Sequence, residues 1–213
     1  MLHKIDALIC LGAGSSQFPI IKSAKQIGLN VIAIDRDLDA IGFGIADEKI
    51  IISTYNTDEI LEELFKFQNL YNFKGLVAGV SGPALHTAAE ISETFNLPGL
   101  THDLIPLATE KSSLRTFCEK NNFKVPKGYK LSKNQPCESD LYFPIIVKPD
   151  YPLIGKKDIS VVQSSEDLSG FINKACDSSS NNFAEIEEYI HGIDVSVMFL
   201  LSKGRAKIIT LWD

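Results

Sequence analysis

The stretch IDALICLGAGSS, residues 5–16, decides how the first part of the chain folds. Residues 5–11 are almost all apolar and do not alternate with polar residues, which is typical of a strand buried on both faces of a parallel sheet. Gly12-Ala13-Gly14 predicts a tight turn, and Ser15 or Ser16 is expected to cap the helix that follows. A strand, a glycine turn and a helix in this order predict the first βα unit of an α/β domain.

The same alternation continues as far as residue 98. Short apolar segments predict strands, and segments with apolar residues at helical spacing follow them. The expected strands span residues 30–34, 49–53 and 75–78, and the expected helices begin at Thr57, which caps its helix, and at Pro83. This order predicts a doubly wound, Rossmann-like parallel sheet over residues 1–98.

From residue 99 onward the pattern changes, and strands outnumber helices. The expected helices span residues 102–108, 111–121 and 165–176, and the expected strands span residues 143–148, 159–163, 184–189, 194–201 and 206–212. Residues 127–142 are turn-rich and polar, with no expected strand. We therefore expect a second, α+β domain over residues 99–213. Because an apolar strand ends directly before Asp213, we expect the chain to be a fragment or one piece of a split protein.

Length and charge exclude several classes of protein. The chain has 213 residues, enough for one large or two small domains, and 45% of them are hydrophobic, which excludes a disordered chain. Neither a membrane span nor a signal peptide is predicted, so a cytoplasmic protein without a membrane partner is expected. The net charge of −6 argues against general nucleic-acid binding but leaves room for a small phosphorylated ligand.

The cysteines and histidines predict no metal site. No C-x-x-C motif occurs, and the histidines are scattered. The cysteines are expected to be reduced structural thiols. They are Cys10, Cys118, Cys137 and Cys176.

The glycine turn allows three interpretations. Gly12 and Gly14 supply two glycines of a dinucleotide-binding G-x-G-x-x-G motif, but Gln17 stands in place of the third. Asp35 ends the second strand, where a ribose-binding acid would stand. A site for NAD, a plain tight turn, and a small anion at the helix N-terminus all stay open.

A more informative set of residues is spread over the second domain. Lys111 begins a helix, and Lys148 ends the apolar strand IIVKP, where a lysine is costly unless it meets an anion. Gly155, Lys156 and Lys157 follow in a loop, and the string EEYIHGID at residues 187–194 joins two strands.

In this order and spacing, these strings resemble ATP-grasp ligases of the carbamoyl-phosphate synthetase and biotin carboxylase type. The resemblance covers nearly the whole chain: residues 1–98 resemble the pre-ATP-grasp domain, and residues 99–213 the N-terminal part of the grasp. It implies an ATP-dependent carboxylate–amine ligase that acts through an acyl phosphate. Its cofactors would be ATP and Mg²⁺, with the metal ligands and catalytic residues beyond Asp213, so this chain alone is expected to be inactive.

The resemblance also assigns roles to residues. Lys111, Lys148 and Lys157 would hold phosphates, Glu187 and Ile190 would bind adenine through their backbone, Glu188 would add a side-chain contact, and Asp194 would bind ribose. The acceptor substrate would lie near Gly14, Ser15, Asp35 and Ser81. The loop departs from the family's glycine-rich pattern, because Gly155 is its one glycine and Asp158 stands where glycine is common. An aspartate there is expected to repel phosphate.

The implied partners are small carboxylate and amine substrates, with a homodimer or a completing C-terminal chain both open. Two other functions stay open as well. One is a non-catalytic nucleotide-binding module or subunit, and the other is an NAD-dependent oxidoreductase.

Overall fold

The computed structural model describes residues 4–137, 142–152, 157–202 and 204–213. Its first part is a parallel four-stranded sheet in the order β3-β2-β1-β4. These strands are β1 (Ile5–Leu11), β2 (Asn30–Ile34), β3 (Glu48–Ile50) and β4 (Tyr71–Ala78). The parallel sheet predicted from residues 5–11 outward is therefore confirmed.

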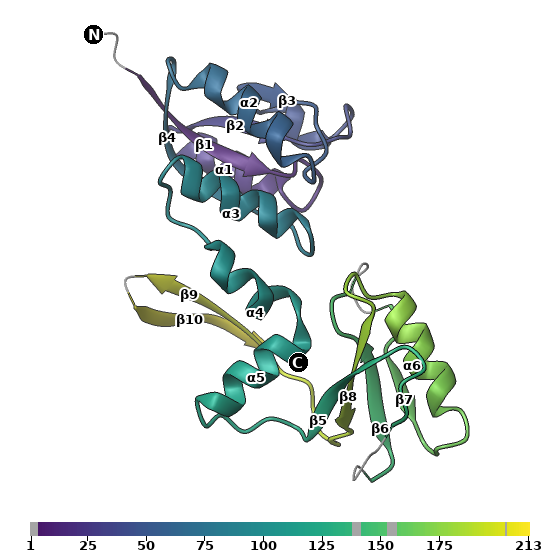
Figure 1. Cartoon of the computed structure of the whole chain (residues 1–213). Coiled ribbons are helices and arrows are strands. Elements are labelled where there is room, and N and C mark those ends of the chain that lie inside the picture. Colours follow the sequence, from purple (N-terminus) through teal and green to yellow (C-terminus); the bar gives the residue numbers. More distant parts are fainter. Residues whose placement is uncertain (1–3, 138–141, 153–156, 203) are drawn as a thin grey trace.

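Helices cover both faces of this first sheet (Figure 1). They are α1 (Phe18–Gln26), α2 (Thr57–Phe67) and α3 (Ala84–Thr94), with the 3-10 helix η1 (Ile41–Gly44) beside α1. Ile21 of α1 packs against one face, and Ile60 and Ile91 of α2 and α3 pack against the other. Burial on both faces explains why the strands read as continuous apolar runs.

The predicted helix caps are wrong at both places. Helix α1 begins later than Ser15 and Ser16, because the carbonyl of Gly14 accepts the N–H groups of Gln17 and Phe18 in a backbone turn. Helix α2 has Asn56 at its N-cap, and the hydroxyl of Thr57 instead lies 2.8 Å from the hydroxyl of Thr87 in α3. Backbone turns and helix–helix packing replace the expected side-chain caps.

Three short helical segments lead to the second sheet. They are η2 (His102–Leu104), α4 (Ile105–Thr109) and α5 (Lys111–Lys120). The second sheet is antiparallel in the order β5-β8-β6-β7. Its strands are β5 (Gly128–Ser132), β6 (Ile145–Pro149), β7 (Ser160–Val162) and β8 (Phe183–Glu188), and α6 (Leu168–Asp177) packs on one face. The division between residues 98 and 99 stays a prediction.

Strand β5 corrects the expectation that residues 127–142 hold no strand. Leu131 is buried and Tyr129 packs beside it in the core under α6, while Lys130 lies between them on the opposite face. The strand is at the edge of the sheet and has only one apolar face, so its polar residues concealed it.

The chain ends in a hairpin of β9 (Ser196–Ser202) and β10 (Arg205–Trp212), which pair with each other in a separate two-stranded sheet. Figure 1 shows the hairpin extending away from the second sheet. Its apolar side chains are exposed on both faces, and they include Met198, Phe199, Leu200, Ile208 and Ile209. Of the helices in the described residues, none is long and apolar enough to cross a membrane.

We expect this hairpin to cause self-association, because a long apolar edge strand pairs readily with other chains. Phe199 and Ile208 lie opposite each other, and 57% and 67% of their surfaces are exposed. Replacing them together, Phe199→Glu with Ile208→Lys, keeps a favourable cross-strand pair. Light scattering over a concentration series should show several-fold less association than in the wild-type chain. Ile27→Lys provides the control, because Ile27 is also an exposed apolar residue but lies outside the hairpin. Equal effects of the two changes on association would contradict the expectation.

Candidate functional site

One face of the second sheet is polar, and the strand register accounts for it. In antiparallel pairs, residues directly opposite each other point to the same face. Glu185 of β8 lies opposite both Lys130 of β5 and Lys148 of β6, and Glu187 lies opposite Gly128 and Ile146. The alternate residues Ala184 and Ile186 pack under α6. The sheet therefore presents an apolar face to α6 and a charged face on its other side, where α5 lies (Figure 1).

A chain of ion pairs crosses this polar face. Arg115 of α5 is buried, and its Nη2 lies 2.5 Å from Oε1 of Glu187. Its Nε donates to Glu185, and its Nη1 donates to the carbonyl of Pro126. The second oxygen of Glu187 accepts from the ammonium of Lys148. Burial raises the pKa of Glu185, an effect that Arg115 partly offsets.

Lys111 places a second ammonium near Lys148. It is the first residue of α5, and its Nζ donates to the carbonyl of Pro149 at 2.7 Å. Burial lowers the pKa of Lys111, and repulsion by the charge of Lys148 lowers it further. The carboxylates of Asp150, Glu187 and Glu185 oppose both effects. An anion between the two ammonium groups would reduce their mutual repulsion.

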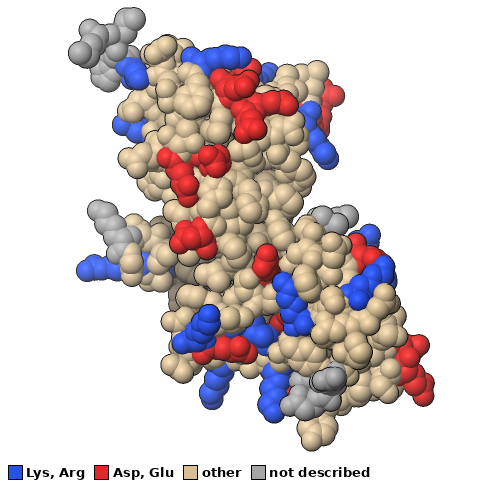
Figure 2. Space-filling view, in the orientation of Figure 1, with Lys and Arg blue, Asp and Glu red and all other residues tan. Residues whose placement is uncertain are grey.

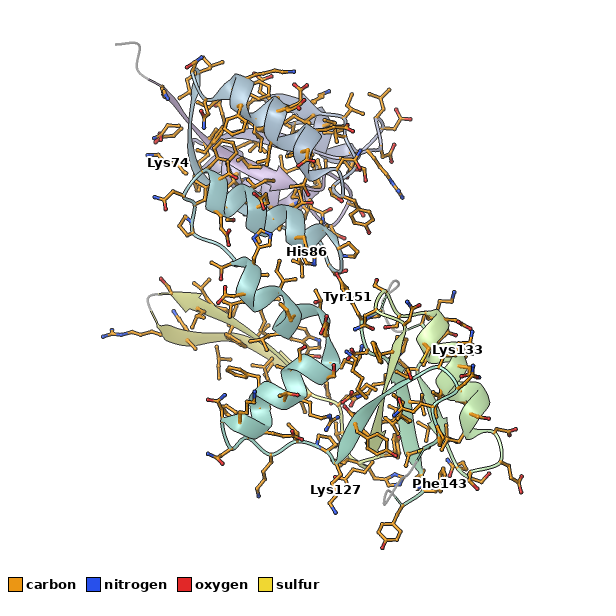
Figure 3. The ribbon with its side chains drawn as sticks, in the orientation of Figure 1. Lys74, His86, Lys127, Lys133, Phe143 and Tyr151 are labelled. Atoms are coloured by element: carbon orange, nitrogen blue, oxygen red, sulfur yellow. The ribbon has the colours of Figure 1, made fainter. Side chains whose placement is uncertain are left out.

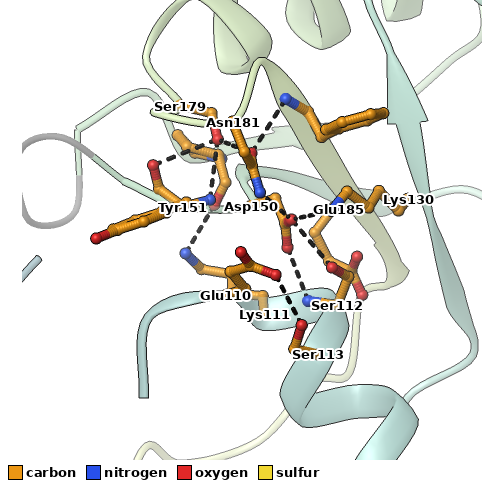
Figure 4. Close-up of polar contacts among 12 residues, drawn as sticks. Glu110, Lys111, Ser112, Ser113, Lys130, Asp150, Tyr151, Ser179, Asn181 and Glu185 are labelled. Atoms are coloured by element: carbon orange, nitrogen blue, oxygen red, sulfur yellow. Dashed lines mark hydrogen bonds and ion pairs between the residues drawn. The ribbon is translucent and has the colours of Figure 1, made fainter. Parts of the chain in front are cut away.

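Asp150 ties the start of α5 to the second sheet (Figure 4). Its fully buried carboxylate accepts from the backbone N–H of Ser112 at 2.7 Å and from the side chains of Lys130 and Asn181, both at 2.8 Å. Its backbone carbonyl accepts from the N–H of Lys111 at 3.1 Å. Burial alone would raise the pKa of Asp150, but these hydrogen bonds outweigh it and hold the pKa below its usual value.

A pocket of about 650 Å³ opens between α5 and the polar face. Ser112, Arg115, Lys130 and Glu185 are among its lining residues. Lys111, Lys148 and Glu187 do not line this pocket, among the residues described, although Arg115 bonds Glu187 directly. The pocket and the two lysines are therefore connected through Arg115, which lines the pocket and bonds Glu187, the partner of Lys148.

The loop after Lys148 is described only in part. Gly155 and Lys156 lie outside the described residues, and Lys157 is exposed. The carboxylate of Asp158 accepts from Ser178 and lies 3.1 Å from Lys174 Nζ, near the end of α6. The hydrogen bond from Ser178, followed by that from Lys174, lowers its pKa. Lys174 of α6 therefore offsets part of the charge of Asp158, and the expected repulsion of phosphate stays a prediction.

The string EEYIHGID is divided between a strand and a connecting segment. Glu187 and Glu188 lie inside β8, where the backbone N–H of Glu188 donates to the carbonyl of Lys127 at 2.8 Å. Ile190 and Asp194 lie in the exposed segment between β8 and β9. The ring of Tyr189 packs edge-on against His191 in the same segment. The predicted adenine and ribose residues are thus contiguous with the polar face through β8.

The predicted substrate residues gather at the carboxyl end of the first sheet. Gly14 and Ser15 follow β1, Asp35 follows β2 and Ser81 follows β4. Ser15 and Ser81 are exposed. The carboxylate of Asp35, however, accepts from the backbone N–H groups of Ala13 at 2.8 Å and Asp37 at 3.0 Å, so it serves the turn itself.

The geometry of this turn disfavours the NAD interpretation. The Gln17 side chain is buried against Gly12 and donates to the carbonyl of Gly79, so it fills the space beside the turn. A pyrophosphate needs that space for close approach to the backbone, and ribose needs an acid that is not already engaged. Gln17 occupies the space that a pyrophosphate would need, and the carboxylate of Asp35 is already bonded to the turn.

Two of the four cysteines, Cys10 and Cys176, are buried. None of the four forms a disulfide, and Cys10 is buried, which raises the pKa of its thiol to about 12. Across the described ranges, no three His, Cys, Asp or Glu side chains are grouped so as to hold a metal ion. Basic and acidic side chains are interspersed over the surface seen in Figure 2, in keeping with the net charge of −6.

The segment after β6 lies near the connection between β3 and α2. Tyr151, labelled in Figure 3, follows that strand. Burial raises its pKa, and Glu110 and Tyr55 raise it further. Tyr55 belongs to the connection between β3 and α2, so the segment after Lys148 lies close to the first part of the chain.

Sequence reasoning missed Arg115, Glu185 and Asp150. Arg115 stands four residues after Lys111, so both lie on one face of α5. Glu185 and Glu187 alternate with the apolar Ala184 and Ile186, a pattern that predicts a strand with one charged face. Those two spacings could have indicated the polar network, but the partners that satisfy Asp150 come from three separate segments: the start of α5, β5 and the residues before β8.

Comparisons with known proteins place the fold. No family model matches the chain. It is 23% identical over 184 residues to the carbamoyl phosphate synthase large chain of Clostridium perfringens, a match that covers 83% of this chain and 17% of that protein. It is 27% identical over 191 residues to the formate-dependent phosphoribosylglycinamide formyltransferase of Prochlorococcus marinus, covering 86% of this chain and 47% of the relative.

Solved structures agree with these relatives. The L-amino acid ligase of Bacillus licheniformis superposes with a TM-score of 0.77 at 18% identity, over 98% of this chain and 50% of that one. The N5-carboxyaminoimidazole synthetase of Staphylococcus aureus, complexed with ADP, superposes with a TM-score of 0.76 at 19% identity, over 98% of this chain and 55% of that one. The fold is that of ATP-grasp ligases, and the resemblance drawn from the sequence is confirmed. The chain spans about half the length, or less, of the proteins it matches.

Proposed function

We propose that the polar face of the second sheet binds the phosphates of ATP. The observation that carries the proposal is that the ammonium of Lys111 donates to the carbonyl of Pro149, the residue directly after Lys148, so that two partly buried lysines lie at the same end of β6. The charge of Lys148 contributes to lowering the pKa of Lys111. A phosphate between them would remove this repulsion and satisfy both charges. The sequence similarity to a carbamoyl phosphate synthase and the ADP complex of a structural neighbour support this choice of ligand.

The other nucleotide contacts follow from the same placement. Adenine would lie against the end of β8 and the exposed segment after it, where the backbone of Glu187 and of Ile190 would meet its edge, and Glu188 would add its side chain. Asp194 would accept from the ribose hydroxyls. Lys157 would reach the phosphates from the loop.

For the whole protein we propose an ATP-dependent carboxylate–amine ligase. A carboxylate would attack the γ-phosphate to give an acyl phosphate with loss of ADP, and a nitrogen nucleophile would then displace phosphate. The acceptor carboxylate would bind at the carboxyl end of the first sheet, beside Gly14, Ser15 and Ser81. Asp35 would shape that site through its bond to Ala13 rather than contact the substrate.

Mg²⁺, when bound, would supply positive charge that offsets the negative charge of the phosphates. The described residues contain no group of ligands for it, so we assign no step in this chain to the metal. We propose that these 213 residues bind nucleotide without completing a ligation cycle, as a non-catalytic nucleotide-binding unit would.

Nucleotide-dependent stabilisation tests this proposal. ATP or ADP should raise the melting temperature of the chain, and NAD should raise it less, because NAD lacks the terminal phosphate that the two lysines would hold. A ligand at a 100-fold excess over its Kd stabilises the folded state by about 2.7 kcal/mol. A thermal shift series in which NAD alone stabilises the chain, or in which none of the three does, would contradict the proposal.

A further inference from the structure

Resting on the proposed nucleotide site, we propose that Arg115 is a positioning residue, which holds the carboxylate of Glu187 and through it the ammonium of Lys148. Arg115 does not need to touch the nucleotide for this role. It acts from α5, on the far side of Glu187 from Lys148.

The contacts of Arg115 leave its guanidinium little freedom. Its three nitrogens donate to Glu185, to the carbonyl of Pro126 and to Glu187. The acceptors come from β8 and from the segment before β5, so one planar group joins α5 to β8 and to the residues that lead into β5. A planar fork with donors in fixed directions orients carboxylates in a way that a lysine ammonium does not.

Gly128 makes room for this guanidinium. A Cβ atom at this position would lie 2.9 Å from Nη2 of Arg115 and 2.2 Å from the carbonyl oxygen of Ile186. The strand therefore approaches β8 and the guanidinium closely only because residue 128 has no side chain. The position of the Arg115 side chain therefore depends on Gly128 of β5 as well as on α5.

Glu187 divides its two oxygens between two cations. Oε1 accepts from Arg115 and Oε2 accepts from Lys148. Without Arg115, the whole charge of Glu187 would fall on Lys148 and draw its ammonium toward β8. The displacement of the Lys148 ammonium and its closer ion pair with Glu187 would each reduce its attraction for a phosphate. Both effects would therefore weaken phosphate binding.

The test separates phosphate binding from general stability by comparing ADP with adenosine, which lacks the phosphates. Arg115→Lys keeps the charge but cannot hold three acceptors in one plane, and Arg115→Gln removes the charge. We expect each to lower the preference for ADP over adenosine, measured by titration calorimetry, about tenfold. Sucrose in all samples favours the folded state, so a loss of stability does not prevent the measurement.

A double-mutant cycle shows whether Arg115 acts through Lys148. In a Lys148→Met background, Arg115→Lys should cause no further loss of ADP preference, because the group it positions is absent. Lys120→Met, at the exposed end of the same helix, should leave the preference unchanged.

Two results would overturn the inference in different ways. Arg115 would be structural only if both Arg115 variants kept the wild-type preference for ADP. The same conclusion would follow if Arg115→Lys lowered this preference as much in the Lys148→Met background as in the wild-type chain. No preference for ADP in the wild-type chain would overturn the proposed function and this inference with it.

Discussion

Replacing Asp150 with alanine should lower the free energy of unfolding by about 3–5 kcal/mol, as removal of one partner from a buried ion pair does. The carboxylate is fully buried and satisfies the backbone of Ser112 and the side chains of Lys130 and Asn181. Alanine would leave these donors without their acceptor, and the start of α5 would lose its attachment to the sheet. Asp150→Asn, which keeps one acceptor oxygen, should cost less.

The effect should depend on pH in a direction set by the lowered pKa of Asp150. A carboxyl whose pKa is lower in the folded state binds protons less tightly there than in the unfolded chain. Its contribution is therefore complete above the ordinary aspartate pKa of about 3.9, and it is lost as pH falls through the lowered value. The difference between wild type and Asp150→Ala should shrink in acid.

Urea denaturation at neutral and acidic pH measures both expectations. Asp177→Ala serves as the matched control, because Asp177 also pairs with a lysine, Lys133, but 63% of its side chain is exposed. Exposed pairs contribute little. Equal losses for the two variants would show that Asp150 is no more important than a surface ion pair.

The two central strands of the first sheet, β1 and β2, were predictable because most of their residues are buried. Residues 5–11 and 30–34 are continuous apolar runs, and both form strands with these bounds. The edge strand β5 was not predictable in the same way. It is buried on one face only, so the polar residues Lys130 and Ser132 interrupt its apolar sequence. Local composition therefore identifies elements whose burial is complete and misses those whose burial depends on a neighbour.

The candidate site was predictable only in part for a related reason. Lys111 and Lys148 stand out because their local contexts, a helix start and the end of an apolar strand, make a charge conspicuous. Arg115 is bound to residues 70 and 72 positions away, and such pairing depends on strand register rather than on local sequence. The ion pair of Asp158 with Lys174 of α6 likewise joins residues 16 positions apart, and local sequence does not indicate it.

Lys148→Met should weaken the binding of ADP or ATP by about 30-fold, which corresponds to about 2 kcal/mol. The ammonium of Lys148 is mostly buried, with 18% of the side chain exposed, and it stands on a strand paired on both sides. A charge held in such a place contributes more than one in water, and losing one preorganised charged contact typically costs about 2–4 kcal/mol. Methionine keeps the length of the stem and removes only the charge, while Arg115 still satisfies Glu187.

Two lysines on the same domain separate this role from a general effect of charge. Lys157→Met, on the exposed loop, should weaken binding at most a few fold, because an exposed charge is well screened. Lys133→Met, an exposed lysine that pairs with Asp177 at the end of α6, should change binding less than twofold. Titration calorimetry of the three variants orders them. A loss at Lys157 equal to or greater than that at Lys148 would mean that the loop holds the phosphates and that the strand lysine serves the Glu187 ion pair alone.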